Sequence, residues 1–452
     1  MNSPMRTTLI MFIIATVMVV LALRLYPWPI QQNLANKINE PLFPEYSSSD
    51  VKSIQIETFV FVDAAQGVVE RFIINQRGNE WFIPSRANFP AQNVARLAEA
   101  TSCLNDLKIE DLTSEDQKDY GLYGVHEPDS DAVGGKGTRF SLLAANAEPI
   151  ASIVVGESPE GRPDQKYVRV SGQPQVYLVT FDEKVLSTEL SSWVDPNLFR
   201  MSQEDARNIK YIEIDNYSAD PDNFATSGKI KHNYRVRIDF AVQSSQPQAT
   251  LIKADPAGKL EDEPIALTLP SQQPNWLTDV LLRLGSIPFN NIRPKQDLVA
   301  KYLAEQTANV QPLEFSSMLN SGFYYRGREN EQHQFLAIGG SLSLGKGNGS
   351  RLTMNFGRLS ELQRGSTEVT RYAFLSAELD ASLLPEPEPI ETDDPAEQRN
   401  YERDLRQWNE AMDRAKRAVA DFNLVHSKWY YLIPEGEYER LMPAIDRLQI
   451  GQ

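Results

Sequence analysis

Cysteine and histidine are scarce in this chain of 452 residues, which has one cysteine, Cys103. A single cysteine cannot form an intrachain disulfide, so a disulfide scaffold is excluded. We expect Cys103 to be a small buried residue on a helix between residues 91 and 107. No HExxH pair or cysteine cluster completes a zinc site, so we expect no metal and no cofactor. The histidines are far apart, at His126, His232, His333 and His426.

An excess of positive charge is also missing. The chain has 45 Lys and Arg residues against 61 Asp and Glu residues, which gives a formal net charge of −16. Phosphate binding needs a basic face, so the composition argues against nucleic acid as a partner. The 41% of hydrophobic residues is enough for ordinary cores and excludes wholesale disorder. The length allows roughly two to four domains.

Catalytic motifs are incomplete. No GxSxG elbow frames a serine, so no triad can be nominated. The run Gly340–Gly347 approaches a phosphate-binding loop, but Gly347 has no hydroxyl for magnesium and a strand pattern follows, so we interpret the run as a hairpin turn. The carboxylates Glu157, Glu160 and Asp164 crowd one segment, which we interpret as a solvated loop. The sequence names no catalytic residue, and the chain is expected to be no enzyme.

One long apolar run is present. Thr7 to Leu23 has no charge and reaches about 26 Å as a helix, close to the thickness of a bilayer core. Arg24, Tyr26 and Trp28 follow, and these residue types suit the membrane interface. No Ala-x-Ala pattern stands near the end of the run, which favours an uncleaved anchor over a signal peptide. We predict a membrane anchor over residues 1–30, in contact with lipid, and a polar tether over 31–50.

The long body must then lie on one side of the membrane. Only a few residues precede the anchor, and no second apolar span follows it. A short basic amino terminus left inside, with the body exported, is the usual arrangement for such an anchor. We predict a single-pass protein of a bacterial inner membrane whose body lies in the periplasm, although Arg24 and Lys37 on the far side weaken the orientation signal.

The body is predicted to be α+β, with two related β-rich units built from antiparallel meanders and helices. Alternating residues predict strands from Ile54 and from Val68, then a helix and further strands to complete a unit over residues 51–200. A similar order returns over 201–383 with 424–452. Ile153–Gly156 resembles Met354–Gly357, and the pattern suggests a duplication. Coincidence between two β-rich domains is the alternative.

Residues 384–423 form an insertion in the second unit. The Pro/Glu-rich stretch 384–390 is predicted to be extended and stiff, and Asp394 and Pro395 then start a long helix. Its apolar residues recur every three or four positions and form one seam. We predict either that the seam covers its own domain or that it binds a partner. The seam residues are Tyr401, Leu405, Trp408, Met412, Ala415, Val419 and Phe422.

Several hydrophobic signatures carry a family resemblance. They are Glu80–Ile83, Tyr120–Leu122, Ile153–Gly156, Tyr167–Val170, Val176–Val179 and Trp193–Asp195. On these, the chain from Ile54 to Leu198 resembles the bacterial domain of unknown function numbered 4340, and Arg351 to Leu448 resembles a degenerate second copy. The resemblance implies a domain behind an amino-terminal membrane helix, often associated with gliding-motility-type ABC-transporter components. It implies no catalytic residue.

These observations predict an accessory or scaffold protein beside a membrane complex, with a membrane protein as its partner. Two alternatives stay open. A periplasmic module that binds an extended ligand or polysaccharide needs a concave site with exposed aromatic residues, and an unrecognised hydrolase needs converging carboxylates or a nucleophile beside its base.

Overall fold

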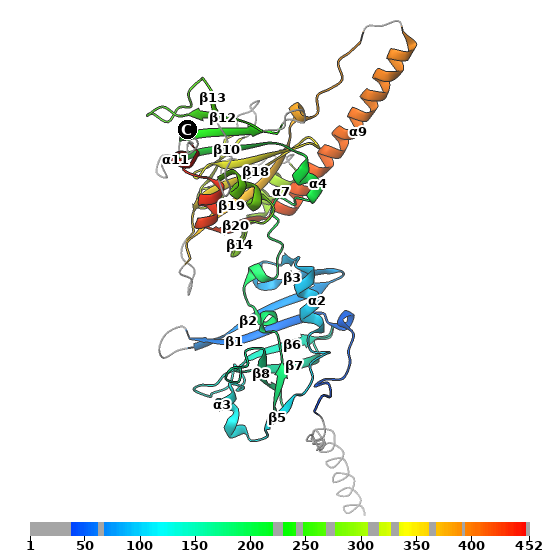
Figure 1. Ribbon diagram of the computed structural model, residues 1–452, viewed down its shortest axis with the longest axis vertical. Helices are drawn as coiled ribbons and strands as arrows, with labels where there is room; N and C mark the ends of the chain where they lie inside the picture. The colour runs from blue at the N-terminus through cyan, green and yellow to red at the C-terminus, as the bar shows by residue number, and fades with distance from the viewer. Residues whose placement is uncertain are drawn as a thin grey trace, which may run out of the picture.

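The computed structural model contains two large antiparallel β-sheets, each at the centre of one unit (Figure 1). We use first unit for residues 51–200, which contain the first sheet, and second unit for the described residues after 200, which contain the second sheet. Figure 1 shows the two units stacked along the long axis of the molecule, with one long helix projecting from the second unit. The structure describes residues 38–61, 67–219, 229–240, 247–267, 276–305, 316–326, 334–360, 368–390 and 394–448.

The first sheet has the strand order β4-β3-β2-β1-β6-β7-β8-β9-β5. Alternation along β1 places Ile54 and Ile56 in the core and Gln55 and Glu57 on the outer face, as a strand of period two requires. The strands are β1 (Ser53–Phe61), β2 (Gly67–Arg77), β3 (Glu80–Ile83), β4 (Phe89–Ala91), β5 (Asp111–Ser114), β6 (Thr138–Leu143), β7 (Pro149–Val155), β8 (Gln165–Val170) and β9 (Val176–Thr180).

The second sheet has the order β13-β12-β11-β10-β17-β18-β19-β20-β14, and β15 (Phe323–Arg326) pairs separately with β16 (Gln334–Ala337). Its strands are β10 (Ile209–Ala219), β11 (Ile230–Asp239), β12 (Gln248–Lys253), β13 (Ile265–Leu267), β14 (Asn291–Pro294), β17 (Ser341–Lys346), β18 (Ser350–Leu359), β19 (Thr370–Leu379) and β20 (Trp429–Pro434).

The helices lie between and beyond these strands. In the first unit they are α2 (Val94–Ser102) and α3 (Tyr120–Tyr123), with 3-10 turns at Ser48–Asp50, Pro84–Arg86, Gln117–Asp119, Glu183–Leu186 and Leu190–Ser192. In the second they are α4 (Gln203–Arg207), α6 (Trp276–Leu284), α7 (Asp297–Glu305), α8 (Ser316–Leu319), α9 (Pro395–His426), α10 (Glu435–Leu441) and α11 (Ile445–Leu448), with a 3-10 turn at Ala381–Leu383.

The two sheets have the same strand order when each is counted from its first strand. In both, the first strand is central, the next three strands extend to one side, and the fifth returns to the far edge beside the last. The prediction of an α+β body with two β-rich units built from antiparallel strands is confirmed at this level. Descent of both units from one family domain stays a prediction.

Some elements differ from those the sequence predicts. Ser341–Lys346 is strand β17, paired with β10 and β18, and only Gly347 to Gly349 form the turn, so the glycine-rich hairpin turn predicted for 340–347 was too long. Period-two alternation of Leu342 and Leu344 was hidden by the glycines on either side. The end of the first unit, which the sequence assigns to strands and a helix, contains two 3-10 turns at Glu183–Leu186 and Leu190–Ser192.

The amino-terminal prediction falls largely outside the described residues. Thr7, Leu23, Arg24, Tyr26 and Trp28 all lie there. Within the ranges that the structure describes, no helix is both long and apolar enough to cross a membrane. Residues 38–50, the second half of the predicted tether, lie along the first unit, where the Asn39 and Leu42 amides donate to Ile109 and Leu107.

Aromatic side chains join the two units. Phe89, at the edge strand β4, lies 5.2 Å from the ring of Trp429, 5.9 Å from Phe289 and 6.3 Å from Tyr431, each in an edge-to-face arrangement. The Ile287 amide also donates to the Pro196 carbonyl across the junction, at 2.8 Å. One hydrophobic core therefore runs through both units, and their relative position is fixed by packing rather than by the linker alone.

Candidate functional site

A groove of about 810 Å³ lies where the units meet. The first unit contributes Trp81 and Phe82 from β3 and Val94 and Leu97 from α2. The second unit contributes Trp429 and neighbouring residues at the end of α9 and the start of β20. Its volume lies within the range of about 300–1,000 Å³ that ligand sites occupy.

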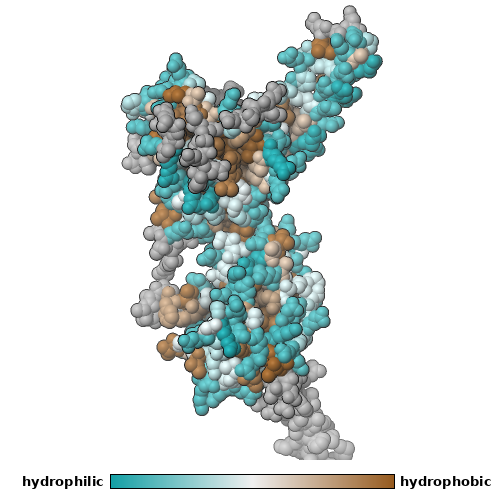
Figure 2. All heavy atoms as spheres, viewed as in Figure 1, coloured by the Kyte–Doolittle hydropathy of each residue, from teal (hydrophilic) through white to brown (hydrophobic). Residues whose placement is uncertain are grey.

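A second hollow of about 480 Å³ continues the first one. Both are lined by Leu424, Lys428 and Trp429, and the second reaches α7 at Lys301. We call the two together the junction groove. Val94 and Leu424 are 75% and 60% exposed in it, although most of the visible surface is hydrophilic (Figure 2). Exposed apolar side chains inside a concave surface are typical of a binding site.

Exposed cations outnumber carboxylates among the residues that line the junction groove. Arg200, Lys301 and Lys428 have no ion-pair partner among the described residues. Two carboxylates also line the groove. Glu80 lies opposite Arg77 in the β2–β3 hairpin, and Asp297 stands in the first turn of α7, where the positive end of the helix offsets its charge. Neither carboxylate has an ion-pair partner among the described residues, so the three exposed cations outnumber the two carboxylates by one, on a chain whose net charge is −16.

The backbone of Arg200 is strained. Its φ of 50° lies in the left-handed region, which is unfavourable for a residue with a Cβ. Burial raises the pKa of Tyr431 and lowers that of His426; the positive charge of Arg200 offsets part of the first shift and adds to the second, so its side chain reaches the junction. Such backbone strain persists only where the surrounding structure holds it, and it is common at functional sites.

Lys295 lies under the groove and is almost fully buried. Its Nζ donates to the carbonyl of His426 at 3.3 Å and to that of Trp429, and it faces the rings of Phe374 and Tyr430. Burial lowers the pKa of Lys295 well below its usual value. Because the His426 carbonyl ends α9 and the Trp429 carbonyl begins β20, we interpret Lys295 as a cap of the helix that also joins it to the strand. The sequence offered no signal for its burial, since it stands in the polar segment 293–297.

His426 is also buried, with Nδ1 2.7 Å from the hydroxyl of Tyr431. Burial, together with the charges of Lys295 and Arg200, lowers its pKa to about 3. The ring is neutral at neutral pH and belongs to the packed junction. Of the other histidines, His232 faces Asp215 at 3.0 Å and His126 contacts the ring of Tyr120, while His333 lies outside the described residues.

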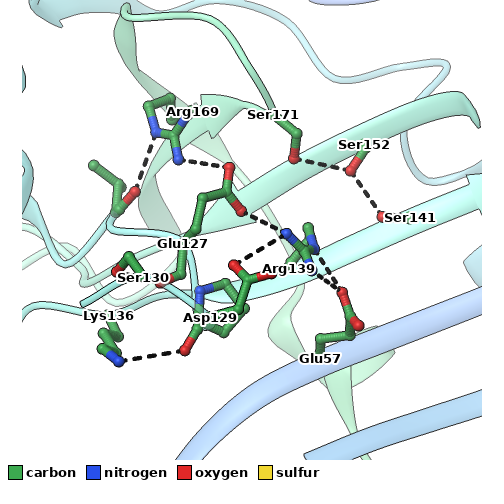
Figure 3. Close-up of polar contacts among 12 residues, drawn as sticks. Glu57, Glu127, Asp129, Ser130, Lys136, Arg139, Ser141, Ser152, Arg169 and Ser171 are labelled. Atoms are coloured by element: carbon green, nitrogen blue, oxygen red, sulfur yellow. Dashed lines mark hydrogen bonds and ion pairs between the residues drawn. The ribbon is translucent and has the colours of Figure 1, made fainter. Parts of the chain in front are cut away.

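The outer face of the first sheet holds the densest group of charges (Figure 3). Glu57 accepts from Arg71 at 2.5 Å and from Arg139, whose Nε lies 2.6 Å away. Glu127 joins Arg139 at 3.1 Å to Arg169 at 2.7 Å. Asp129 accepts from Arg139, and this hydrogen bond and charge lower the pKa of Asp129 although burial alone would raise it. We call these six residues the outer-face network.

The ion pairs of the outer-face network hold a loop on the first sheet. Arg169 is 4% exposed, and its other nitrogens donate to the carbonyls of Val125 and Gln173. Its three arginines balance its three carboxylates, and the charges bind the loop that carries Glu127 to the sheet. A hydrolase needs a carboxylate or nucleophile free to act on a substrate, and no member of the network is free in this way. Beside it, Ser141, Ser152 and Ser171 form a hydrogen-bonded ladder (Figure 3).

The other predicted chemical groups remain dispersed. Glu157, Glu160 and Asp164 are exposed on the loop between β7 and β8, as in the interpretation from sequence. Cys103 ends α2, and burial raises the pKa of its thiol to about 12, which keeps it unreactive. Among the residues with described positions, no group of three or more His, Cys, Asp and Glu could hold a metal ion.

The seam of α9 changes character along the helix. At its carboxyl end Ala415 and Phe422 are buried against the second unit, and Val419 is half-buried. Towards its amino end Tyr401, Leu405, Trp408 and Met412 are half-buried. There the indole of Trp408 donates to the carbonyl of Leu384 at 2.9 Å, so the Pro/Glu-rich stretch covers part of the seam. The two halves of the seam therefore meet different surroundings.

Comparisons with known proteins place a family domain at the junction. No curated protein and no solved structure matches the chain. A family match begins at β3, later than the resemblance from Ile54 suggested, and it continues through the linker and past β12 to residue 263. It includes Trp81, Val94 and Arg200 of the groove but not Lys301 or Lys428. Residues 81–263 thus match the family described as a domain of unknown function, DUF4340.

Proposed function

We propose that this chain is a non-catalytic accessory protein of a bacterial membrane complex and that it holds a partner in the junction groove. The proposal rests on the groove, which is concave, is lined by both units and contains exposed apolar side chains. The proposal includes a single-pass anchor at residues 1–30, a body in the periplasm and an association with an ABC-transporter component. The apolar run 7–23 and the resemblance to the DUF4340 family support that part.

The alternative of a module for an extended ligand or polysaccharide draws on the same groove. Trp81 and Trp429 line it, and aromatic rings are common in such sites. Trp429, however, is 9% exposed and packs on Phe89, so it offers little free ring surface. Exposed Val94 and Leu424 favour apolar side chains of a protein partner over sugar hydroxyls. The hydrolase alternative has no support in the described residues, because their densest carboxylate group is fully paired.

Photocrosslinking in native membranes tests this function. A photoreactive amino acid at Val94 or Leu424 should capture one and the same neighbour, because both positions line the groove. Val133 and Leu282, which are 97% and 74% exposed and lie outside the groove, are the matched controls. Equal capture at the controls, or none at Val94 and Leu424, would contradict the proposal. Extraction of the membranes with carbonate tests the anchor separately: the protein should stay in the pellet.

A further inference from the structure

The junction groove combines an apolar floor with positive charge. Its apolar side chains include Val94 and Leu97 on one side and Leu424 on the other. The uncompensated cations Lys428 and Lys301 follow the same track towards α7, and Arg200 stands at the linker. On a chain with 61 acidic and 45 basic residues, such a track is complementary to an apolar ligand that carries carboxylates.

The groove is also held in shape before any ligand binds. Phe89 sits among three aromatic rings of the second unit, so the two walls cannot separate without losing those contacts. A groove that is already ordered spends little free energy on ordering its own side chains when it binds. The positive φ of Arg200 shows that the linker is held in a strained form at the same place.

We do not expect a ligand to bind the groove by adding a strand to the edge of the first sheet. The edge strand β4 borders the groove, but its central residue is Pro90, which lies opposite Phe82 and has no N–H to donate. Proline at an edge strand disfavours pairing with another chain. A ligand must therefore be recognised mainly through its side chains: apolar groups on the floor and carboxylates at Lys301 and Lys428.

From this combination we infer that the junction groove binds an extended, acidic peptide segment with alternating apolar and carboxylate side chains. The inference rests on the proposed function and names the chemistry of the partner. The anionic surface of a membrane would meet the same lysines, but exposed Val94 and Leu424 lie in a groove and not on a flat face, which favours a peptide.

Labelled synthetic peptides test the inference. We would use three peptides of about ten residues, which span at most about 35 Å when extended. They share the same leucine and valine positions and carry Glu, Gln or Lys between them. With the full-length protein in detergent, fluorescence anisotropy should show the Glu peptide binding about tenfold more tightly than the Gln peptide and the Lys peptide binding least, at low salt. The preference should shrink as salt is added.

A charge reversal on the protein provides the matched comparison. The double variant K301E/K428E should lose the preference for Glu and gain one for Lys. Both residues are exposed, so the fold should tolerate the change. The control K118E/K184E alters the net charge equally at two exposed lysines outside the groove and should bind as the wild type does. Equal binding of all three peptides, no binding, or an unchanged preference in K301E/K428E would overturn the inference.

The outcome separates this inference from the proposed function. If Val94 captures a neighbour in membranes while no peptide discriminates by charge, the accessory function stands and the acidic chemistry is wrong. Discrimination without any neighbour captured at Val94 supports the peptide site and contradicts the accessory function. The last measurement uses vesicles that contain phosphatidylglycerol. If the wild type binds these vesicles, K301E/K428E does not bind them, and no peptide binds, the lysines contact a lipid surface and the inference is overturned.

Discussion

The two units differ most at the connection between their last two meander strands. In the first unit, β8 passes to β9 through the short turn at 171–175. In the second, the chain leaves the sheet after β19 and returns to it at β20 only after the Pro/Glu-rich stretch and α9. The same strand order therefore accepts a long insertion at one hairpin, because the strands on both sides keep their partners: β19 still pairs with β20 at 370–373.

At the base of the insertion, a side chain of α9 forms hydrogen bonds with the backbone of β19 in place of a neighbouring strand. The side chain of Asn423 accepts from the amide of Ala377 at 2.7 Å and donates to its carbonyl at 2.9 Å. Both residues are buried. One amide side chain thus satisfies the backbone groups that a neighbouring strand would otherwise pair, which a buried backbone requires.

The outer faces of the two sheets differ as well. Register places Glu57 of β1 opposite Arg71, and it places Asp215 of β10 opposite Arg235, so the two carboxylates occupy equivalent positions. Glu57 joins a network that binds a loop to the sheet, whereas Asp215 accepts from Arg235 at 2.6 Å and contacts His232. The comparison shows that equivalent positions in the two sheets take part in two different local structures.

The largest expected effect comes from separating the units. Phe89→Ala removes a buried ring that contacts three aromatic residues across the junction, and such losses cost about 3–5 kcal/mol. We expect calorimetry to show two unfolding transitions in place of coupled unfolding. Phe61→Ala, at a 70% exposed position of the first unit, is the control. A single unshifted transition for Phe89→Ala would show that the units are coupled by other contacts.

A smaller loss is expected from the base of the insertion. Asn423→Ala removes both hydrogen bonds between the Asn423 side chain and the backbone of Ala377, at a cost of about 1–2 kcal/mol for each bond. Urea unfolding should place the total near 2–4 kcal/mol and confine it to the second unit. Asn409→Ala, on the exposed part of α9, serves as the control and should change stability by less than about 0.5 kcal/mol. Equal effects would contradict the role of Asn423.

The stability that Asp215 contributes is expected to depend on pH. Burial would raise the pKa of Asp215, but hydrogen bonds from His232 and Arg235 outweigh it and lower the pKa. A lowered carboxyl pKa contributes stability above the usual Asp pKa of about 3.9, and this stability is lost as pH falls through the lowered value. Asp215→Asn should destabilise the second unit at neutral pH by about 1–3 kcal/mol.

The measurement for Asp215 is the urea midpoint at several pH values. Below about pH 4 the curves of Asp215→Asn and the wild type should converge. Asp131→Asn, an exposed substitution in the first unit, is the control and should follow the wild type throughout. A constant gap between Asp215→Asn and the wild type down to about pH 2 would mean that the charge of Asp215 does not stabilise the fold.

The smallest effect is expected on the projecting part of α9. Trp408→Phe keeps a ring in the seam but removes the donor to the Leu384 carbonyl, which is worth about 1 kcal/mol. We expect the sheet to unfold at an unchanged midpoint and the stretch 384–390 to become more open to proteolysis. Tyr401→Phe is a conservative control on the same seam. A large shift of the unfolding midpoint for Trp408→Phe would make the whole seam part of the core.

Much of the architecture was predictable because it follows from local periodicity. Alternation at Ile54 and Ile56 predicts which face of a strand is buried. Helical spacing at Leu277 and Val280 does the same for a helix. Strand β17 was missed because glycines surround a short alternation. The groove could not be predicted, since Trp81, Arg200 and Lys428 are far apart in sequence and meet only through the packing of the two units.

The sequence by itself determined the acidic balance, the two β-rich units, the long helix with its apolar seam and the lack of a familiar catalytic motif. These follow from composition and from repeats of two or about three and a half residues, which act over short distances. The tertiary structure alone decided which side chains meet: that Phe89 joins the units, that Lys295 is buried beneath α9 and that unpaired lysines line a groove. Burial and charge pairing depend on residues distant in sequence, and no local pattern records them.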